Sequence, residues 1–399
     1  MHLSDRIQRL EESATLRMAR LGRELAAQGH RVINLSLGEP DFDTPDHIKN
    51  AAKVALDNGY TKYTPVSGLP ELRKAIAEKL QRENGLTWTA ENVVVSTGAK
   101  QSLCNAALAL LNPGDEVLIL APYWVSYSEI IKLADATPII LRASVEDDFK
   151  VTAAQLEAAI TPKTRMVWFS SPCNPTGAVF THDELEAFAN IIAKHDGIYI
   201  VADEIYEYIS YAGKHVSIGA FPQVRDRTIT VNGFAKGFAM TGWRLGYIGA
   251  PLWIAQACEK IQGQVTSGAN SFAQKAAVTA LTSSLEPTYA MREAFENRRE
   301  LIGKGLREIT GFTVPQPDGA FYFFPDISHY FGYTYKDYTI SNSDDFAMFL
   351  LGEAHVSTVG GASFGDTDCL RISYAASADD LLEAVDRIKN AVAKLNKVG

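Results

Sequence analysis

The sequence predicts an α/β protein with a large domain, built on a mostly parallel central sheet flanked by helices, and a smaller α/β domain. Two observations carry this prediction. Apolar runs of strand length alternate with helical segments, and a long charged helix precedes an aromatic-rich region of different character. Runs that are apolar on both faces are typical of parallel strands covered by helices on each side. The 399 residues, 46% of them hydrophobic, suffice for two cores.

The expected elements alternate along the chain. Strands are expected at 93–96, 117–120, 138–141, 166–170, 198–202, 228–231 and 246–249. Helices are expected between them, for example at 71–81, 100–111 and 183–195, each followed by a glycine or proline that stops it. Ligand chemistry in such a sheet gathers at the carboxyl ends of the strands, so the polar motifs that follow these runs should meet in one crevice.

The domain boundary is expected inside a long charged helix over residues 287–310, after which a Pro- and Gly-containing turn opens the aromatic-rich region. We therefore expect residues 48–290 to form the large domain and 291–399 the small one. Residues 1–47 are expected to form an N-terminal segment that packs with the small domain.

Composition narrows the class of function. The formal charge of -9, from 47 acidic and 38 basic residues, argues against a nucleic-acid partner or an anionic membrane surface. No stretch is apolar and long enough to span a bilayer, and residues 1–15 do not resemble a signal peptide. The four cysteines show no CxxC spacing and the eight histidines no metal-ligand spacing. We therefore expect a cytoplasmic protein with reduced thiols and no metal.

Lys236 is the most informative residue. It lies in the run from Asn232 to Arg244 among small and apolar neighbours. Loss of hydration lowers the pKa of such a lysine and makes its neutral amine available to form a Schiff base. Arg244 is suited to hold a phosphate, so the pair suggests a phosphorylated aldehyde cofactor, pyridoxal 5'-phosphate (PLP). Taken alone, the run also fits a surface lysine beside a glycine-rich loop.

Three further motifs decide between these interpretations. They are Ser-Pro-Cys-Asn-Pro-Thr-Gly at 171–177, Asp-Glu-Ile-Tyr at 203–206 and Leu-Arg-Ile-Ser-Tyr at 370–374. Together with the lysine run, in this order, the chain resembles the class I aminotransferases of PLP fold type I, closest to the bacterial aspartate aminotransferase branch. The resemblance extends from Leu-Gly-Glu-Pro-Asp-Phe at 37–42 to the C-terminal helix. It implies that residues 48–290 bind PLP and that the protein is a homodimer with shared sites.

Several residues are candidates to bind the cofactor. Gly98 and Ala99 stand where a strand turns into a helix, which is an anion cradle as well as an ordinary βα turn. Lys100 follows in the same turn. Asp203 ends an apolar strand, so its carboxylate needs a cationic partner, and a pyridinium N–H is one; a helix cap is the simpler role.

The resemblance assigns four more cofactor contacts. It implies that Trp124 stacks on the cofactor ring and that Asn174 and Tyr206 hydrogen-bond its phenolate oxygen. It also implies that Tyr63 reaches the phosphate of the other subunit. Without the resemblance, core packing would account equally for Trp124 and Tyr206.

The substrate contacts follow in the same way. The planar fork of Arg371 suits a substrate α-carboxylate, and a surface salt bridge is disfavoured by its apolar neighbours. Gly38 belongs to a loop that closes over the substrate in relatives, and Trp124 and Asn174 also face it. In the bacterial branch, a lysine and a threonine at the positions of Lys100 and Thr15 contact the side-chain carboxylate of aspartate or glutamate.

The resulting hypothesis is a ping-pong transamination from L-aspartate to 2-oxoglutarate, giving oxaloacetate and L-glutamate. Lys236 serves both as Schiff-base residue and as the group that moves the α-proton. The alternatives are an aromatic or aliphatic amino donor, served by the aromatic cluster 321–324, and prephenate as acceptor. Elimination or racemisation with the same cofactor is a further alternative. A PLP-binding regulatory protein is a remote one, because residues before Gly38 leave no room for a DNA-binding domain.

Three positions depart from the family pattern. Glu11 stands where relatives that accept prephenate carry a basic residue, so prephenate activity is not expected. Gly233 and Ala235 stand where relatives carry serines near the lysine, which shifts phosphate binding toward Arg244, Tyr63 and backbone amides. Residues 35–37, Leu-Ser-Leu, are larger than is usual before Gly38 and are expected to reshape the pocket entrance.

Overall fold

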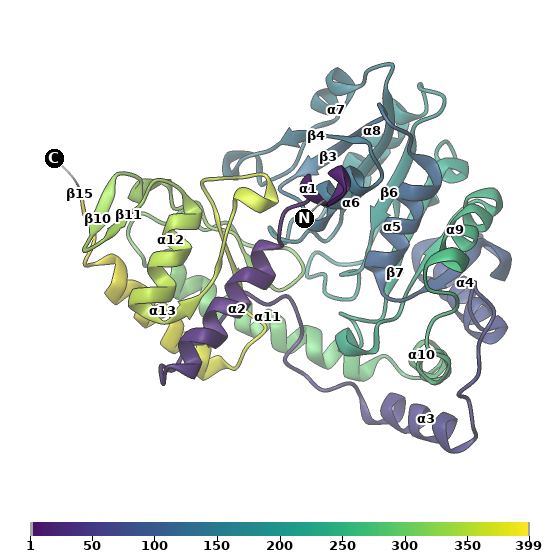
Figure 1. Cartoon of the computed structure of the whole chain (residues 1–399), viewed down its shortest axis with the longest axis horizontal. Coiled ribbons are helices and arrows are strands. Elements are labelled where there is room, and N and C mark those ends of the chain that lie inside the picture. The colour runs from purple at the N-terminus through teal and green to yellow at the C-terminus, as the bar shows by residue number, and fades with distance from the viewer. Residues whose placement is uncertain (1–2, 398–399) are drawn as a thin grey trace.

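A computed structural model of the chain describes residues 3–397. Its largest element is a seven-stranded sheet in the order β2-β8-β7-β6-β5-β3-β4, at the right of Figure 1. Its strands are β2 (Val93–Ser96), β3 (Glu116–Ala121), β4 (Thr137–Arg142), β5 (Thr164–Ser170), β6 (Tyr199–Asp203), β7 (Thr228–Gly233) and β8 (Gly246–Gly249). The β8 strand is antiparallel to β2 and β7, and the other pairings are parallel. The predicted α/β fold with a mostly parallel sheet is confirmed.

Helices cover both faces of this sheet. One face packs against α5 (Ala99–Leu110), α6 (Ser126–Leu133) and α9 (Leu252–Val265). The other packs against α7 (Ala153–Ala159) and α8 (His182–Ile192) under β3, β5 and β6, and against α3 (Asp46–Asp57), α4 (Pro70–Asn84) and α10 (Ser271–Thr282) under β2 and β8. Val94 faces the first core, and Val93 and Val95 face the opposite one. Burial on both faces explains why the strands are apolar at every position.

Local signals set the helix ends. Pro70 occupies the first turn of α4, and Gly85 ends that helix in the left-handed conformation at φ 71°. A reciprocal capping box between Thr181 and Glu184 opens α8. That helix ends three residues before the expected residue 195, because Lys194 and His195 bond to carbonyls only three residues back and the last turn tightens.

The C-terminal region forms a second body at the left of Figure 1, reached through the long helix α11 (Glu286–Arg307). It contains α12 (Ser343–Phe349), α13 (Ala378–Val392) and the short strands β9 (Tyr322–Phe323), β10 (Tyr333–Tyr335), β11 (Tyr338–Thr339), β12 (Val356–Ser357), β13 (Val359–Gly360), β14 (Leu370–Ser373) and β15 (Asn396–Lys397). Among residues 3–397, no helix is both long and apolar enough to cross a membrane.

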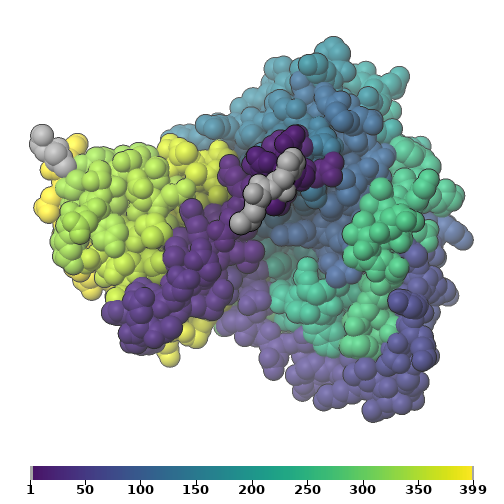
Figure 2. Space-filling view, viewed as in Figure 1, coloured from purple at the N-terminus to yellow at the C-terminus, as the bar shows by residue number. Residues whose placement is uncertain are grey.

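The N-terminal segment joins this second body. It comprises α1 (Asp5–Gln8), α2 (Ala14–Ala27) and β1 (Ile33–Asn34), and β1 pairs in parallel with β12. Met18, Ile33 and Leu35 share one apolar core with α11, α12 and α13. In Figure 2 the segment, in purple, lies across the surface from the C-terminal body to the large one. We propose the division 1–47, 48–290 and 291–399, whose extreme ends lie outside the described residues.

Candidate active site

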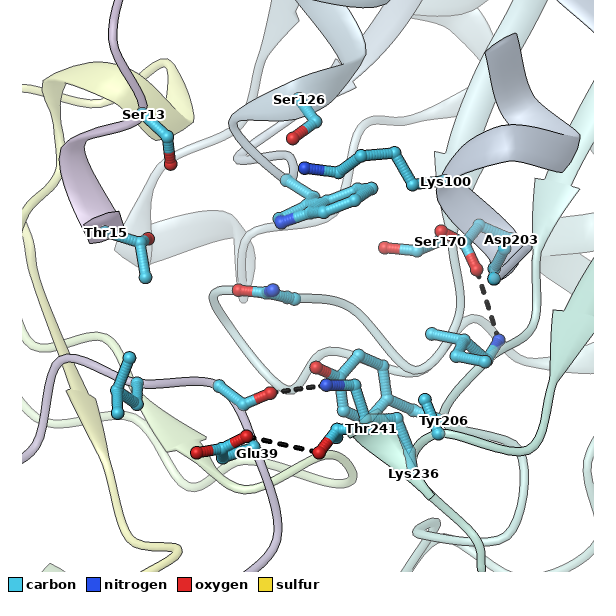
Figure 3. A pocket seen from close by; sticks show the side chains of 18 of the residues that line it. Ser13, Thr15, Glu39, Lys100, Ser126, Ser170, Asp203, Tyr206, Lys236 and Thr241 are labelled. Atoms are coloured by element: carbon cyan, nitrogen blue, oxygen red, sulfur yellow. Dashed lines mark hydrogen bonds between the residues drawn. The ribbon is translucent and has the colours of Figure 1, made fainter. Parts of the chain in front are cut away.

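A cavity of about 350 Å³ lies where the carboxyl ends of β5, β6 and β7 meet the N-terminus of α5. Twelve of the thirteen residues predicted for the site line it: Thr15, Gly38, Gly98, Ala99, Lys100, Trp124, Asn174, Asp203, Tyr206, Lys236, Arg244 and Arg371. Tyr63 lies outside this cavity with its surface 99% exposed. Its predicted role concerns the site of a second subunit. In Figure 3 the labelled side chains of Thr15, Lys100, Asp203, Tyr206 and Lys236 surround this cavity.

Asp203, the last residue of β6, is a buried carboxylate. Its Oδ2 accepts a hydrogen bond from Tyr127 at 2.7 Å, and its Oδ1 accepts one from the Ile205 amide at 3.2 Å. No Lys, Arg or His nitrogen of residues 3–397 lies within 4.0 Å of it. Burial therefore dominates and raises the pKa of this carboxyl to about 6. The site therefore contains a buried carboxyl group, that of Asp203, without a cationic partner from the described chain.

Lys236 faces the same cavity from the loop after β7. Its Nζ donates a hydrogen bond to the Gly38 carbonyl of the N-terminal segment, drawn as a dashed line in Figure 3. Burial lowers the pKa of the amine to about 8, with a smaller opposing effect from Glu39. At pH 7 about a tenth of such an amine is neutral, against about 3 in 10,000 for an ordinary lysine. Burial at this position therefore makes the Lys236 amine a better nucleophile near pH 7.

The turn from β2 into α5 forms an anion cradle. Gly98 caps α5 at φ 82°, a left-handed conformation that favours glycine. The amides of the first helical turn have no partner within the helix. A Cβ on Gly98 would lie 2.6 Å from Nη2 of Arg244, so the guanidinium stands directly over this turn. Helix dipole and arginine together suit a phosphate group.

Arg371 is buried on β14, with 1% of its surface exposed. Its Nη1 donates to Asn174 Oδ1 at 3.0 Å, and its Nη2 donates to Thr15 Oγ1 at 3.3 Å and to the Ser36 carbonyl. Its Nε has no partner, and no carboxylate of residues 3–397 lies within 4.0 Å. A buried guanidinium without an anion is costly, so this geometry suits the carboxylate of a ligand.

Lys100 marks the opposite side of the cavity. Its Nζ lies 4.8 Å from the ring centre of Trp124, and in Figure 3 it lies beside Ser126. Its pKa is lowered, first by desolvation and then by the charge of Arg244. No carboxylate of the described chain lies within 4.0 Å of this ammonium either. Among residues 3–397, Lys236 and Arg244, which also line the cavity, likewise have no such partner, so the large body supplies three cations without a carboxylate and the second body supplies Arg371.

Sequence reasoning missed several lining residues. Tyr127 belongs to the quoted motif around Trp124, yet only the structure joins it to Asp203. Tyr322, whose hydroxyl lies 2.7 Å from that of Tyr206, belongs to the aromatic cluster that the sequence associates only with the alternative aromatic donor. Glu39, inside the Leu-Gly-Glu-Pro motif, accepts a hydrogen bond from Thr241 at 3.1 Å. No local signal distinguishes these residues from core or surface ones.

Comparisons with known proteins agree with this geometry. The family "Aminotransferase class I and II" matches residues 30–388. A relative from Rhizobium leguminosarum bv. phaseoli, named probable aspartate/prephenate aminotransferase, is 48% identical over 97% of this chain and 98% of its own. The aspartate aminotransferase structure from Rhizobium meliloti is 41% identical with a TM-score of 0.96, covering 99% of this chain and 100% of that one. Aspartate aminotransferase from Thermus thermophilus with maleate is 41% identical with a TM-score of 0.93, covering 98% and 100%.

The chain therefore belongs to the class I and II aminotransferases. It is a transaminase whose cofactor is PLP, as the sequence predicted. The residues present fit that cofactor. A buried carboxylate without a cation, an anion cradle and a buried lysine face one cavity, and the buried Ser170 Oγ on its wall has no hydrogen-bond partner.

Proposed function

We propose that this enzyme transfers the amino group of L-aspartate to 2-oxoglutarate and yields oxaloacetate and L-glutamate by a ping-pong mechanism. The observation that carries the proposal is the pair of cations, Lys100 and Arg371, that line one cavity without a carboxylate within 4.0 Å. A substrate with two carboxylates satisfies both. The names of the relatives support this choice, as does the dicarboxylate maleate in the name of the Thermus thermophilus structure.

In this proposal Arg371 binds the α-carboxylate, because its rigid fork has a free Nε and is held in place by Asn174 and Thr15. Lys100 and the hydroxyl of Thr15 bind the distal carboxylate. Trp124, beneath the Lys100 ammonium, stacks on the cofactor ring and limits where the substrate lies. Gly38 carries the loop that contacts Lys236, so substrate and lysine meet under this loop.

In this proposal, different residues bind different parts of the cofactor. When bound, PLP supplies an electron sink for the charge that develops at the substrate α-carbon. Asp203 pairs with the protonated ring nitrogen, and Asn174 and Tyr206 hydrogen-bond the phenolate oxygen. Gly98, Ala99, the Lys100 amide and Arg244 hold the phosphate. Lys236 accepts the α-proton on Nζ and returns it, and its lowered pKa keeps a usable neutral fraction near pH 7.

We also propose that the enzyme is a cytoplasmic homodimer. The fully exposed Tyr63, with the exposed Tyr60 three residues before it, supports an interface at which Tyr63 reaches the phosphate of the second subunit's cofactor. The four cysteines are free thiols, which suits a reducing compartment.

A single-turnover comparison of L-aspartate, L-alanine and L-phenylalanine tests the proposal. The absorbance change of the PLP-loaded enzyme is followed after mixing with each donor. We expect fast conversion with aspartate and slow conversion with the other two. Preference for alanine or phenylalanine would overturn the dicarboxylate assignment and leave transamination intact. Ammonia released in repeated turnover without an oxo-acid acceptor would instead indicate elimination, and a D-amino acid would indicate racemisation.

Prephenate is the second candidate acceptor, because curated relatives at 48% identity carry it in their names. Glu11 opposes it here. Its backbone N–H bonds to Glu129 at 2.9 Å, and Glu11 lines a second cavity that shares Ser13, Lys100 and Ser126 with the active site. This position, at which relatives that accept prephenate carry a basic residue, therefore offers that acceptor no cation here. We expect 2-oxoglutarate to be used far better than prephenate.

A further inference from the structure

Behind Asp203 lies a second group of charged side chains that the mechanism does not use. We call Lys79, Asn84, Glu204, Glu207 and His215 the buried charge cluster. Lys79 is 0% exposed, Glu204 2% and Glu207 8%, and the His215 side chain is 8% exposed. Glu204 directly follows Asp203, yet it contacts residues of α4 and does not line the active-site cavity. The cluster therefore borders the catalytic strand end from the other side.

Hydrogen bonds occupy the carboxylates of this cluster. Asn84 donates to Glu204 at 2.9 Å and to Glu207 at 2.8 Å, and Ser217 donates to the other oxygen of Glu204 at 2.6 Å. Lys79 donates to Glu207. His215 places Nε2 3.0 Å from Glu204 Oε2, although neither ring nitrogen has a partner in hydrogen-bond geometry. The contact between His215 and Glu204 is therefore mainly one of charge.

A metal ion does not account for the cluster. The ligand atoms of Glu204, Glu207 and His215 do lie within 4.8 Å of one another. The Lys79 ammonium, however, contacts one of these carboxylates, that of Glu207, and a second cation there would meet its repulsion. Charge balance is the better account, because Lys79 and a protonated His215 face the buried carboxylates of Glu207 and Glu204. A third carboxylate, that of the partly exposed Glu83, lies 3.6 Å from the Lys79 ammonium.

The pKa directions agree with this balance. Burial alone lowers the pKa of His215, but the charge of Glu204, followed by that of Glu207, raises it above its ordinary value against the opposing charge of Lys79. Burial raises the pKa of Glu207, and Lys79 and His215 more than offset it. His215 is therefore protonated in the pH range around 6 in which Asp203 titrates.

The cluster acts on Asp203 through Glu204. After burial, a negative charge on Glu204 is one of the effects that raise the pKa of the Asp203 carboxyl. A cation beside Glu204 reduces the effect of the Glu204 charge on the Asp203 carboxyl. Backbone amides also hold the strand end that carries both acids, with the Glu204 N–H bonded to the Val231 carbonyl and the Ile205 N–H to Asp203 Oδ1. Removal of the imidazole thus changes charge more than backbone position.

We propose that His215 is a positioning residue of the active site: it offsets the charge of Glu204 and so keeps Asp203 ionised for the cofactor's ring nitrogen. The inference rests on the role proposed for Asp203. His215 lies outside the cavity and twelve positions after Asp203 in the chain. In this proposal it nevertheless lowers the pKa of the Asp203 carboxyl. His215→Asn should leave the cavity lining unchanged and make Asp203 harder to ionise.

An infrared titration tests this without substrate. The carbonyl stretch of protonated Asp203 is followed against pH in the full-length chain freed of PLP, and the Asp203→Asn variant identifies the band. We expect a midpoint about half a pH unit or more higher in His215→Asn than in the parent. Glu204→Gln should lower the midpoint, and the double variant should return toward the parent value. Replacement of the exposed His182 by Asn is the matched control and should change nothing.

Two results would overturn the proposal. One is a folded His215→Asn variant with an unchanged midpoint. The other is a double variant that shifts as far as His215→Asn alone, because that loss would be structural. If His215→Asn does not fold, an unchanged midpoint in Glu204→Gln decides against the proposal in the same way. The PLP dissociation constant of Asp203→Asn, measured separately, reports on the role of Asp203 itself, so failure of one inference is distinguishable from failure of the other.

Discussion

The ionised carboxylate of Asp203 should destabilise the cofactor-free fold, and the substitution Asp203→Asn should remove this destabilisation. A carboxyl whose pKa rises from 3.8 to about 6 on folding stabilises the folded chain fully below pH 3.8 and loses that stabilisation as the pH rises through about 6. The loss above pH 7 is about 3 kcal/mol, since each pKa unit corresponds to about 1.4 kcal/mol. At pH 5 the loss is about half as large. Asparagine does not titrate and has a similar shape, so it escapes the loss.

Urea unfolding of the PLP-free chain, followed by tryptophan fluorescence at pH 5 and pH 8, measures this effect. We expect the free energy of unfolding of Asp203→Asn to exceed that of the parent by about 3 kcal/mol at pH 8 and by about half as much at pH 5. Asp196→Asn, at a fully exposed side chain, is the matched control and should behave like the parent at both values.

PLP should reverse the order of stabilities. The cofactor's ring cation removes the cost in the parent and has no carboxylate to pair with in Asp203→Asn, so saturating PLP should stabilise the parent much more than the variant. If the PLP-free variant is no more stable than the parent at pH 8, or if the difference does not grow with pH, burial does not govern the ionisation of Asp203 and the argument fails.

Four other changes test the remaining assignments. Lys100→Met should lower kcat/KM for aspartate roughly 10- to 150-fold, as expected for one hydrogen bond to a charged group, and leave L-alanine unchanged in steady-state assays; equal losses for both donors would remove Lys100 from distal-carboxylate binding. Lys236→Ala should abolish turnover while the chain still folds by circular dichroism, and measurable transamination would contradict its role. Tyr127→Phe removes a hydrogen bond that lowers the Asp203 pKa, so the carboxyl should titrate above about 6 by infrared spectroscopy and PLP should bind more weakly; an unchanged midpoint would mean that this bond is unimportant. Glu11→Lys should raise the rate with prephenate relative to 2-oxoglutarate, and an unchanged ratio would show that charge at this position does not select the acceptor.

The regular elements were predictable because their causes are local. A strand buried on both faces is apolar at every position, so β2 and β8 have the bounds expected from sequence. The end of α8 was placed too late, because the tightening of a last helical turn depends on carbonyl positions that hydropathy does not record.

The residue types of the proposed site were also legible in the sequence. Lys236, Asp203 and Arg371 are charges embedded in apolar runs, and a buried charge requires a partner. Their order along the chain, with the glycine turn at Gly98, was enough to indicate the family and its cofactor. The lining of one cavity by residues as distant as Thr15 and Arg371 followed from the fold that this family implies.

The fold class, the cofactor and the charged residues of the site could thus be predicted from the sequence. The groups that shift the pKa values of those charged residues became apparent only in three dimensions. Tyr127 reaches Asp203 from 76 positions away, and the buried charge cluster joins α4 to the loop after β6. Such pairings depend on distances of a few ångströms between separate elements, because electrostatic effects in a protein interior depend on distance and burial and not on sequence separation.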